Sequence, residues 1–404
     1  MTDPVRDADG LLPPRAGDVV AATQALVTAL RRALDPQAAP LPPAADGVVT
    51  AAAVPSRDVV EMARRHRVGT LLLGVADAAG LDADDVAVLR ADRTREVHQA
   101  MVVQAATVHV LGALDRAEVP ALVYKGVALA ARTTGDPTAR GGGDVDLLVH
   151  PDDVEAAHRT LLAADCTFHA SYSPAPGSEL WPVARYVNPE LPYWWRGVSI
   201  DLHWRVDLAP QAFAVPFDAL WQRRTEVRLT GHHVPTLDDI DALLVTAVHG
   251  TKERWRRLRW VVDVVRQAAA VPEDAWPDVL ARARASGSEA SLGIALHMAE
   301  QLMGAPVAPV SAGPLARQWG EQGWALMLAD AVVGSSFSWQ GGLARARWWW
   351  GTVPPGAARW RRVATYVLPA EDLVLLPLPR ALVPLYLPLR PVLRRRRAQR
   401  KAVG

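Results

Sequence analysis

The chain has a single cysteine, Cys166, among its 404 residues. One cysteine cannot form an intramolecular disulfide, and it argues against a zinc site built from cysteines. The N-terminus also lacks a secretory signal pattern, because it mixes Asp3, Asp7 and Asp9 with few apolar residues. We therefore expect a cytoplasmic protein.

The chain also lacks an excess of charge of either sign. The 44 Lys and Arg residues nearly balance 43 Asp and Glu residues, giving a formal net charge of +1. This balance argues against nucleic-acid binding driven by overall charge. Residues 373–393 are apolar but are interrupted by Arg380, Arg390 and several prolines. No uninterrupted run there approaches the ~20 residues of a membrane span, so we do not expect a transmembrane helix.

Lysine is scarce: only Lys125, Lys252 and Lys401 occur among the 44 basic residues. A lysine ammonium is a compact, adjustable point charge, whereas the arginine guanidinium is a fixed planar fork. Two of the three lysines fall in segments that other features also single out, which adds mild support for those segments.

Hydrophobic residues make up half of the chain, which is enough for a large core in two or three domains. Helical periodicity dominates except in one central part, where short apolar runs indicate strands. We predict an α+β fold, with a small mixed-sheet core between N-terminal and C-terminal helical regions. The predicted divisions are a helical region with a loose leader (1–116), an α/β core (117–235), a helical follow-on (236–305) and a Trp-, Pro- and Arg-rich region (306–404).

The predicted core has the order strand, helix, strand, helix, strand. A short apolar run ends at Tyr124 and is followed by Lys125-Gly126 and a helix. A glycine-rich loop, Arg140-Gly-Gly-Gly143, leads into a second strand, 144–149. After a further helix, the run 198–204 is the third strand. This order indicates a small unit of strands and packed helices.

Two of these strands carry acidic residues in alternate positions. Asp144 and Asp146 share one face of their strand, roughly 6–7 Å apart, and Asp201 and His203 share a face of theirs. If the strands are neighbours, three carboxylates converge, and two such charges at 4 Å repel by about 4 kcal/mol. A divalent cation removes this repulsion, and oxygen ligands suit Mg²⁺ or Mn²⁺. Two such ions could clamp the attacking and leaving oxygens of a phosphoryl displacement.

Other interpretations of these residues remain. Asp144 could cap the turn after the glycines, with Asp146 a solvated strand residue. A zinc site of Asp201, His203 and His249 is a second alternative. An EF-hand is excluded, because Leu-Leu-Val follows Asp146 where that loop needs a glycine.

Four ordered blocks resemble the uncharacterised nucleotidyltransferase family of the DNA polymerase β-like superfamily. They are Tyr124-Lys-Gly-Val-Ala-Leu-Ala130, then Arg140 before Asp144-Val-Asp-Leu-Leu-Val149, then Ile200-Asp-Leu-His-Trp204, and finally His249-Gly-Thr-Lys252 with the helix after it. Together they span roughly residues 60–300. The resemblance implies a mixed sheet covered by helices, with Asp144, Asp146 and Asp201 as the metal-binding and catalytic carboxylates.

Many members of the superfamily hold the triphosphate with Gly-Ser, where this chain has Lys125-Gly126. Gly126 would let the backbone approach a phosphate at a helix N-terminus, and Lys125 would add a positive charge. The resemblance gives Arg140 a triphosphate contact. Lys125 could equally be a surface lysine at a strand end, and Arg140 could pair with Asp136.

A polar stripe of residues at three-to-four spacing marks the helical region after the core. Its functional interpretation has His249 or Lys252 contact a phosphate or base in the nucleotide cleft, alongside His203. The alternative is a solvated helix face with internal ion pairs.

The last hundred residues combine Trp348, Trp349 and Trp350 with the arginines from Arg394 to Arg397. Aromatic residues with positive charge suit an anionic membrane surface, which would make the protein membrane-peripheral, or a protein partner. Packing of the tryptophans in the core, with a solvated basic tail, is the alternative.

These features predict a metal-dependent nucleotidyltransferase. Its Mg²⁺ or Mn²⁺ would support transfer of a nucleotidyl group from an NTP, such as ATP, to a small-molecule or peptide acceptor. Asp201 would lie nearest the acceptor and help to deprotonate it. The alternative function is a catalytically idle nucleotide-binding or scaffold protein in a biosynthetic or membrane-surface assembly.

Overall fold

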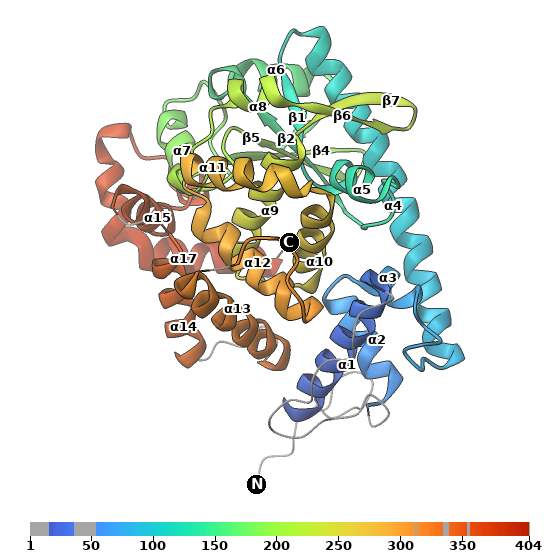
Figure 1. Ribbon diagram of the computed structural model, residues 1–404. Helices are drawn as coiled ribbons and strands as arrows, with labels where there is room; N and C mark the ends of the chain where they lie inside the picture. Colours follow the sequence, from blue (N-terminus) through green and yellow to red (C-terminus); the bar gives the residue numbers. More distant parts are fainter. Residues whose placement is uncertain (1–15, 36–53, 312, 334–338, 354–355, 404) are drawn as a thin grey trace. The chain divides into compact units, whose positions relative to one another are not determined.

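The computed structural model describes residues 16–35, 54–311, 313–333, 339–353 and 356–403 (Figure 1). The predicted loose leader and the Pro/Ala-rich stretch at 36–45, which the sequence marks as a linker, lie almost entirely outside these residues. The chain divides into two compact units, each of which is described by itself. The helical unit comprises residues up to 95, 250–269 and 293–349, and the sheet unit comprises residues 96–249, 270–292 and 350–404.

The helical unit is built around fully buried aromatic and aliphatic side chains. Trp255 and Trp348 are both completely buried, and Trp348 Nε1 donates a hydrogen bond of 2.9 Å to the Thr251 carbonyl oxygen. Trp348 belongs to the tryptophan-rich segment, and its burial makes it a core residue. The helices lying wholly or largely in this unit are α1 (Ala16–Leu34), α2 (Ser56–Arg65), α3 (Gly69–Leu73), α10 (Leu258–Ala270), α12 (Glu289–Met303), α13 (Pro314–Val333) and α14 (Trp339–Gly351).

The sheet unit contains a mixed five-stranded sheet of order β1-β2-β5-β4-β3. Only the β2–β5 pair is parallel; the other three pairs are antiparallel. A separate antiparallel hairpin follows. The strands are β1 (Ala121–Val123), β2 (Asp144–Val149), β3 (Thr167–Phe168), β4 (Glu190–Trp195), β5 (Val198–His203), β6 (Thr225–Leu229) and β7 (His232–Thr236).

Side-chain alternation gives the sheet one apolar and one polar face. On the apolar face, Val145, Ile200 and Tyr193 are almost completely buried in the core of the sheet unit. On the other face, Asp146 on β2 lies beside Asp201 on β5. The core therefore holds the two central strands in register, and this register fixes the spacing of the carboxylates.

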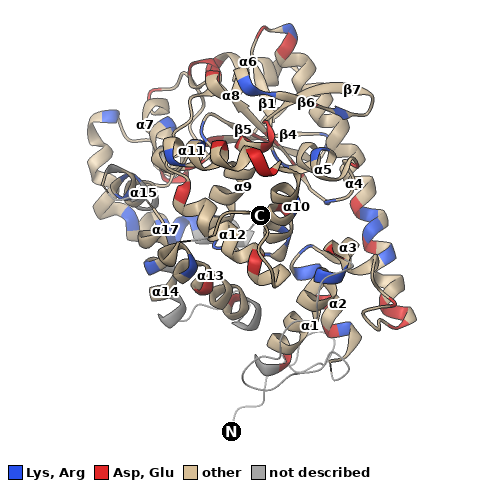
Figure 2. Ribbon diagram, viewed as in Figure 1, with Lys and Arg blue, Asp and Glu red and all other residues tan. Residues whose placement is uncertain are grey.

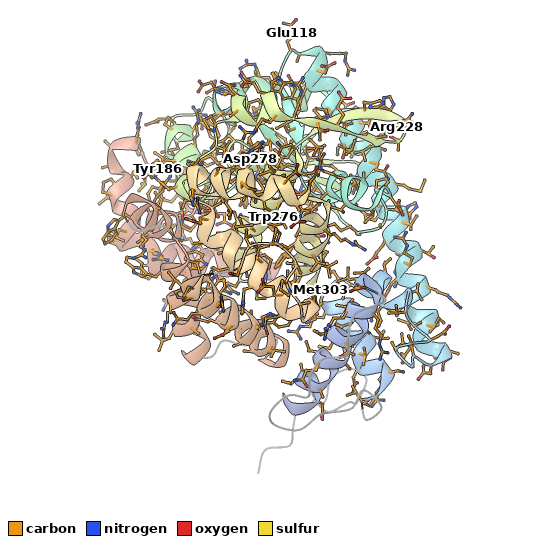
Figure 3. All side chains as sticks on the ribbon, in the orientation of Figure 1. Glu118, Tyr186, Arg228, Trp276, Asp278 and Met303 are labelled. Carbon is orange, nitrogen blue, oxygen red and sulfur yellow. The ribbon has the colours of Figure 1, made fainter. Side chains whose placement is uncertain are left out.

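Helices surround the sheet and the hairpin (Figure 1). In α11, Trp276 is buried, whereas Asp278 pairs with Arg282 at 2.9 Å on the exposed side (Figure 3). The helices lying wholly or largely in this unit are α4 (Ala83–Arg116), α5 (Gly126–Thr134), α6 (Val154–Ala163), α7 (Trp181–Val187), α8 (Phe217–Arg223), α9 (Asp239–Lys252), α11 (Trp276–Ser286), α15 (Ala357–Val367), α16 (Ala370–Leu375) and α17 (Tyr386–Val403).

Within the described part of the chain, α4 alone has the length and composition of a helix that could cross a bilayer. In the most apolar stretch of 18 residues of α4, 44% of the stretch is buried inside the protein. Ala100, Val103 and Leu114 from this helix pack into the core of the sheet unit. Residues 373–393 are divided among the end of α16, the 3₁₀ helix η5 (Arg380–Leu385) and the first part of α17.

The predicted α+β class is confirmed, with a mixed five-stranded sheet flanked by helices. The predicted strands at 144–149 and 198–204 correspond to β2 and β5. The strands β3 and β4 and the β6–β7 hairpin were not predicted from the sequence. The four-part division of the chain remains a prediction.

Candidate active site

The carboxylates meet where β2 and β5 run side by side. Asp146 and Asp201 are register partners in this parallel pair, so their side chains emerge next to each other on the polar face. Asp146, Asp201 and His203 each offer a ligand atom within 4.8 Å of the others. Asp144 lies on the same face, two residues before Asp146, and is exposed at the start of β2. The β2–β5 pairing thus brings Asp146 and Asp201 together with His203, and Asp144 lies two residues before Asp146 on the same face.

Two basic side chains converge on one oxygen of Asp146. Lys125 Nζ lies 3.0 Å from Asp146 Oδ1 and donates a hydrogen bond to it. His203 Nε2 lies 3.2 Å from the same oxygen. Lys125 is therefore not a surface lysine at a strand end, because its side chain is only 16% exposed and reaches into the acidic site.

Glu190 extends the site on the far side of His203. It is the register partner of His203 on β4, and its Oε2 lies 3.1 Å from His203 Nδ1. These two atoms are close but not aligned for a hydrogen bond. The imidazole thus lies between two carboxylates. No pattern in the sequence pointed to Glu190, because β4 itself was not predicted.

The electrostatics of the two central acids differ. Burial acts to raise the pKa of Asp146, but Lys125 and His203 outweigh it and hold that pKa well below its usual range. Burial acts to lower the pKa of Lys125, but Asp146 outweighs it and the net shift is upward. For Asp201, burial and the charge of Glu190 act together and raise the pKa to about 7. Basic groups of the protein therefore outweigh the burial of Asp146, whereas burial and neighbouring charge prevail at Asp201.

This arrangement fits a divalent cation. Among the described residues, the carboxylates of Asp144 and Asp201 have no hydrogen-bond or ion-pair partner, and both are accessible. Carboxylate oxygens with one imidazole nitrogen nearby form a donor set that Mn²⁺ and Mg²⁺ accept. A separation of 3.2 Å between His203 Nε2 and Asp146 Oδ1 also matches two adjacent ligands about 2.1 Å from one ion.

The segment around Gly126 adjoins these acids. Gly126 opens α5 with a φ of +56°, and a Cβ there would lie 3.3 Å from the Asp144 carbonyl oxygen. Gly142 lies next to Gly126, because a Cβ on Gly142 would lie 3.7 Å from the Gly126 Cα. The helix N-terminus, the glycine-rich loop and the first acid of β2 are thus in contact. Arg140 ends the turn directly before this loop.

Two further predicted site residues are His249 and Lys252. His249 ends the first segment of the sheet unit, whereas Lys252 belongs to the helical unit. Their roles remain predictions. Among the described residues, His203 joins Asp146 and Asp201 in the group able to hold a metal ion, and His249 is outside that group. The alternative zinc site of Asp201, His203 and His249 therefore lacks support.

The comparison with curated proteins found no match for this chain. The model of a protein family described as uncharacterised nucleotidyltransferase matches residues 53–304, which is more than half of the chain. That match includes α5, the glycine-rich loop and all three acids of the site. The chain belongs to the uncharacterised nucleotidyltransferase family.

Proposed function

We propose that this protein transfers a nucleotidyl group from an NTP to a small-molecule or peptide acceptor, with Mg²⁺ or Mn²⁺ as the cofactor. The observation that carries the proposal is the register pairing of Asp146 with Asp201, which sets two carboxylates side by side next to Asp144 and the N-terminus of α5. The family match supports nucleotidyltransferase activity in general, and the donor and acceptor are our inference.

The three acids would hold the cation, which would neutralise the phosphate oxygens and charge that develops in the displacement. Within the described part of the chain, Asp144 and Asp201 contribute carboxylates without other partners, and Asp146 contributes one that a hydrogen bond from Lys125 already orients. The glycine at the start of α5 leaves room for a phosphate beside free backbone N–H groups. Lys125 supplies a positive charge next to that position, and Arg140 is our candidate for a further triphosphate contact.

Asp201 is the carboxylate that we assign to the acceptor. It differs from Asp146 in having no basic side chain bound to it among the described residues, so its oxygens are free to accept a proton. Small molecules and peptides suit the site better than nucleic acid, because the net charge of the chain is only +1.

One observation favours a second candidate function, a nucleotide-binding scaffold without turnover. The Lys125 ammonium already neutralises Asp146, so part of the acidic cluster is compensated without any divalent ion. In such a protein, NTP would bind through Lys125 and the α5 N-terminus alone.

Calorimetric titration of each NTP, with and without Mg²⁺, distinguishes the two. For the enzyme, we expect binding that requires Mg²⁺ and disappears in an Asp144→Asn/Asp146→Asn variant. Binding that survives the loss of both acids would favour the scaffold. Absence of NTP binding under all conditions would contradict both candidates. Asp115→Asn, an exposed acid on α4, is the matched control.

A further inference from the structure

One side of helix α17, in the C-terminal segment of the sheet unit, packs against the core of that unit. Tyr386 and Leu393 of α17 are 2% and 1% exposed and belong to the core of the sheet unit. The Tyr386 hydroxyl donates a hydrogen bond to the Leu376 carbonyl oxygen and accepts one of 3.2 Å from the Leu378 N–H. These contacts fix the start of α17 against the preceding chain.

An ion-pair cluster fixes the next turns. Arg397 lies 3.0 Å from Asp372, which is 1% exposed, and 3.3 Å from Glu371 on α16. The inward side of α17 is thus supplied with apolar and charged partners. The opposite side of α17 is exposed and does not belong to the core.

The outward side is unusually apolar in its first part. The large apolar residues there are 43% to 62% exposed and fall within eleven residues of η5 (Arg380–Leu385) and α17; they are Leu382, Leu385, Leu387 and Val392. Single exposed leucines are ordinary on soluble proteins, but a cluster marks a surface that binds something.

Positive charge follows directly. Arg394, Arg395 and Arg396 are exposed in the next turn of α17. The sequence of α17 has seven basic residues and no acidic one. Figure 2 colours lysine and arginine blue and the acidic residues red. We call these three arginines and the four apolar residues the C-terminal surface.

We propose that the C-terminal surface binds an anionic lipid bilayer. Leucine and valine side chains would enter the boundary between headgroups and acyl chains, and the guanidinium groups beside them would contact lipid phosphates. A nucleic acid would use only the arginines and leave the apolar half without a partner. A second copy placed by a twofold axis would bring like charges together.

The test is flotation of the full chain with vesicles of phosphatidylcholine alone or with about one third phosphatidylglycerol, without nucleotide. One variant, Leu385→Ser/Leu387→Ser, removes apolar contact, and another, Arg394→Gln/Arg395→Gln/Arg396→Gln, removes charge. The matched controls are Leu162→Ser on α6 and Arg116→Gln/Arg159→Gln/Arg228→Gln, all at exposed positions; Arg228 is labelled in Figure 3. Circular dichroism checks that every variant is folded.

We expect the wild type and controls to float with the anionic vesicles only, and each surface variant to lose at least tenfold in apparent affinity. Loss in the arginine variant alone, with competition by RNA, would instead identify a nucleic-acid surface. Self-association that the leucine variant abolishes, without flotation, would identify a contact between copies. Either result, or no flotation of the wild type, overturns the proposal. Because no NTP is present, its failure is independent of the proposed activity.

Discussion

Lys125 and Asp146 form a largely buried ion pair of 3.0 Å at the point where β1 leads into α5. In the nucleotide-free protein the Lys125 ammonium compensates the buried charge of Asp146. Under the proposed function the same ammonium would also contact the triphosphate of NTP.

Replacing Lys125 by Met should leave the Asp146 carboxylate buried without its cation. Removing one partner of a buried pair costs about 3–5 kcal/mol, so we expect the melting temperature to fall in EDTA. Saturating Mg²⁺ should restore part of the loss, because a divalent ion compensates the same charge. Thermal unfolding with and without Mg²⁺ measures both effects, and Lys252→Met is the matched control. An unchanged melting temperature in EDTA would show that the ion pair contributes nothing.

Replacing Asp201 by Asn should have opposite effects on stability and on metal binding. Burial and the charge of Glu190 raise the pKa of Asp201 to about 7, so at pH 8 the ionised group opposes folding by up to about 4 kcal/mol. The variant should therefore be more stable than the wild type in EDTA at pH 8. This gain in stability should shrink toward pH 5, because Asp201 of the native wild type is protonated at that pH. Stabilisation by Mg²⁺ should be lost, and a variant that keeps it would remove Asp201 from the metal site.

Replacing Gly126 by Ala should distort the proposed phosphate site. The φ of +56° costs a residue with a side chain about 1–2 kcal/mol, and the new Cβ would lie 3.3 Å from the Asp144 carbonyl oxygen. We expect modest destabilisation in chemical unfolding together with at least tenfold weaker NTP binding. Gly135→Ala, also at positive φ but in open space, is the control for backbone strain alone. Equal NTP affinity in both variants would argue against phosphate binding at Gly126.

Replacing His203 by Gln should change which metal is preferred. An imidazole nitrogen next to Asp146 favours Mn²⁺ over Mg²⁺, whereas an amide oxygen keeps the site acceptable to Mg²⁺. Calorimetry should show a larger loss of affinity for Mn²⁺ than for Mg²⁺. The Mn²⁺ electron spin echo spectrum of the wild type should show coupling to a histidine nitrogen that the variant lacks. Its absence from the wild type would place His203 outside the metal ligands.

His66, in the helical unit, makes the stability of the protein depend on pH. Burial, helped by the charges of Arg65 and Arg257, lowers the pKa of His66 to about 4, and its Nδ1 accepts a hydrogen bond of 3.3 Å from the Leu258 N–H. The unfolded chain takes up a proton below pH 6.5 and the native protein does not. Stability is therefore lost as the pH falls from 6.5 to 4, by about 3 kcal/mol.

The variant His66→Asn keeps an acceptor and does not titrate. Urea unfolding between pH 4.5 and 7.5 should show a shallower pH dependence for this variant than for the wild type. The exposed His232→Asn serves as the control. Identical slopes in wild type and His66→Asn would contradict the lowered pKa.

The sequence by itself determined the local parts of this site. Alternation along 144–149 and 198–203 placed Asp144, Asp146, Asp201 and His203 on strand faces, because side-chain direction on a strand has a period of two. The blocks around Lys125 and Asp144 also indicated the family. The short edge strand β3 and the strand β4 were missed, because the run Glu190–Trp195 contains a proline and only fits a sheet once β5 is beside it.

Only the tertiary structure decided which residues meet. Pairing of β2 with β5 in parallel, rather than with β1 alone, brought Asp201 to Asp146, and pairing of β4 with β5 brought Glu190 to His203. Such contacts join positions up to 57 residues apart, as in His203 and Asp146. They depend on strand order and register, which packing of the whole apolar face fixes and which no local pattern of residues contains.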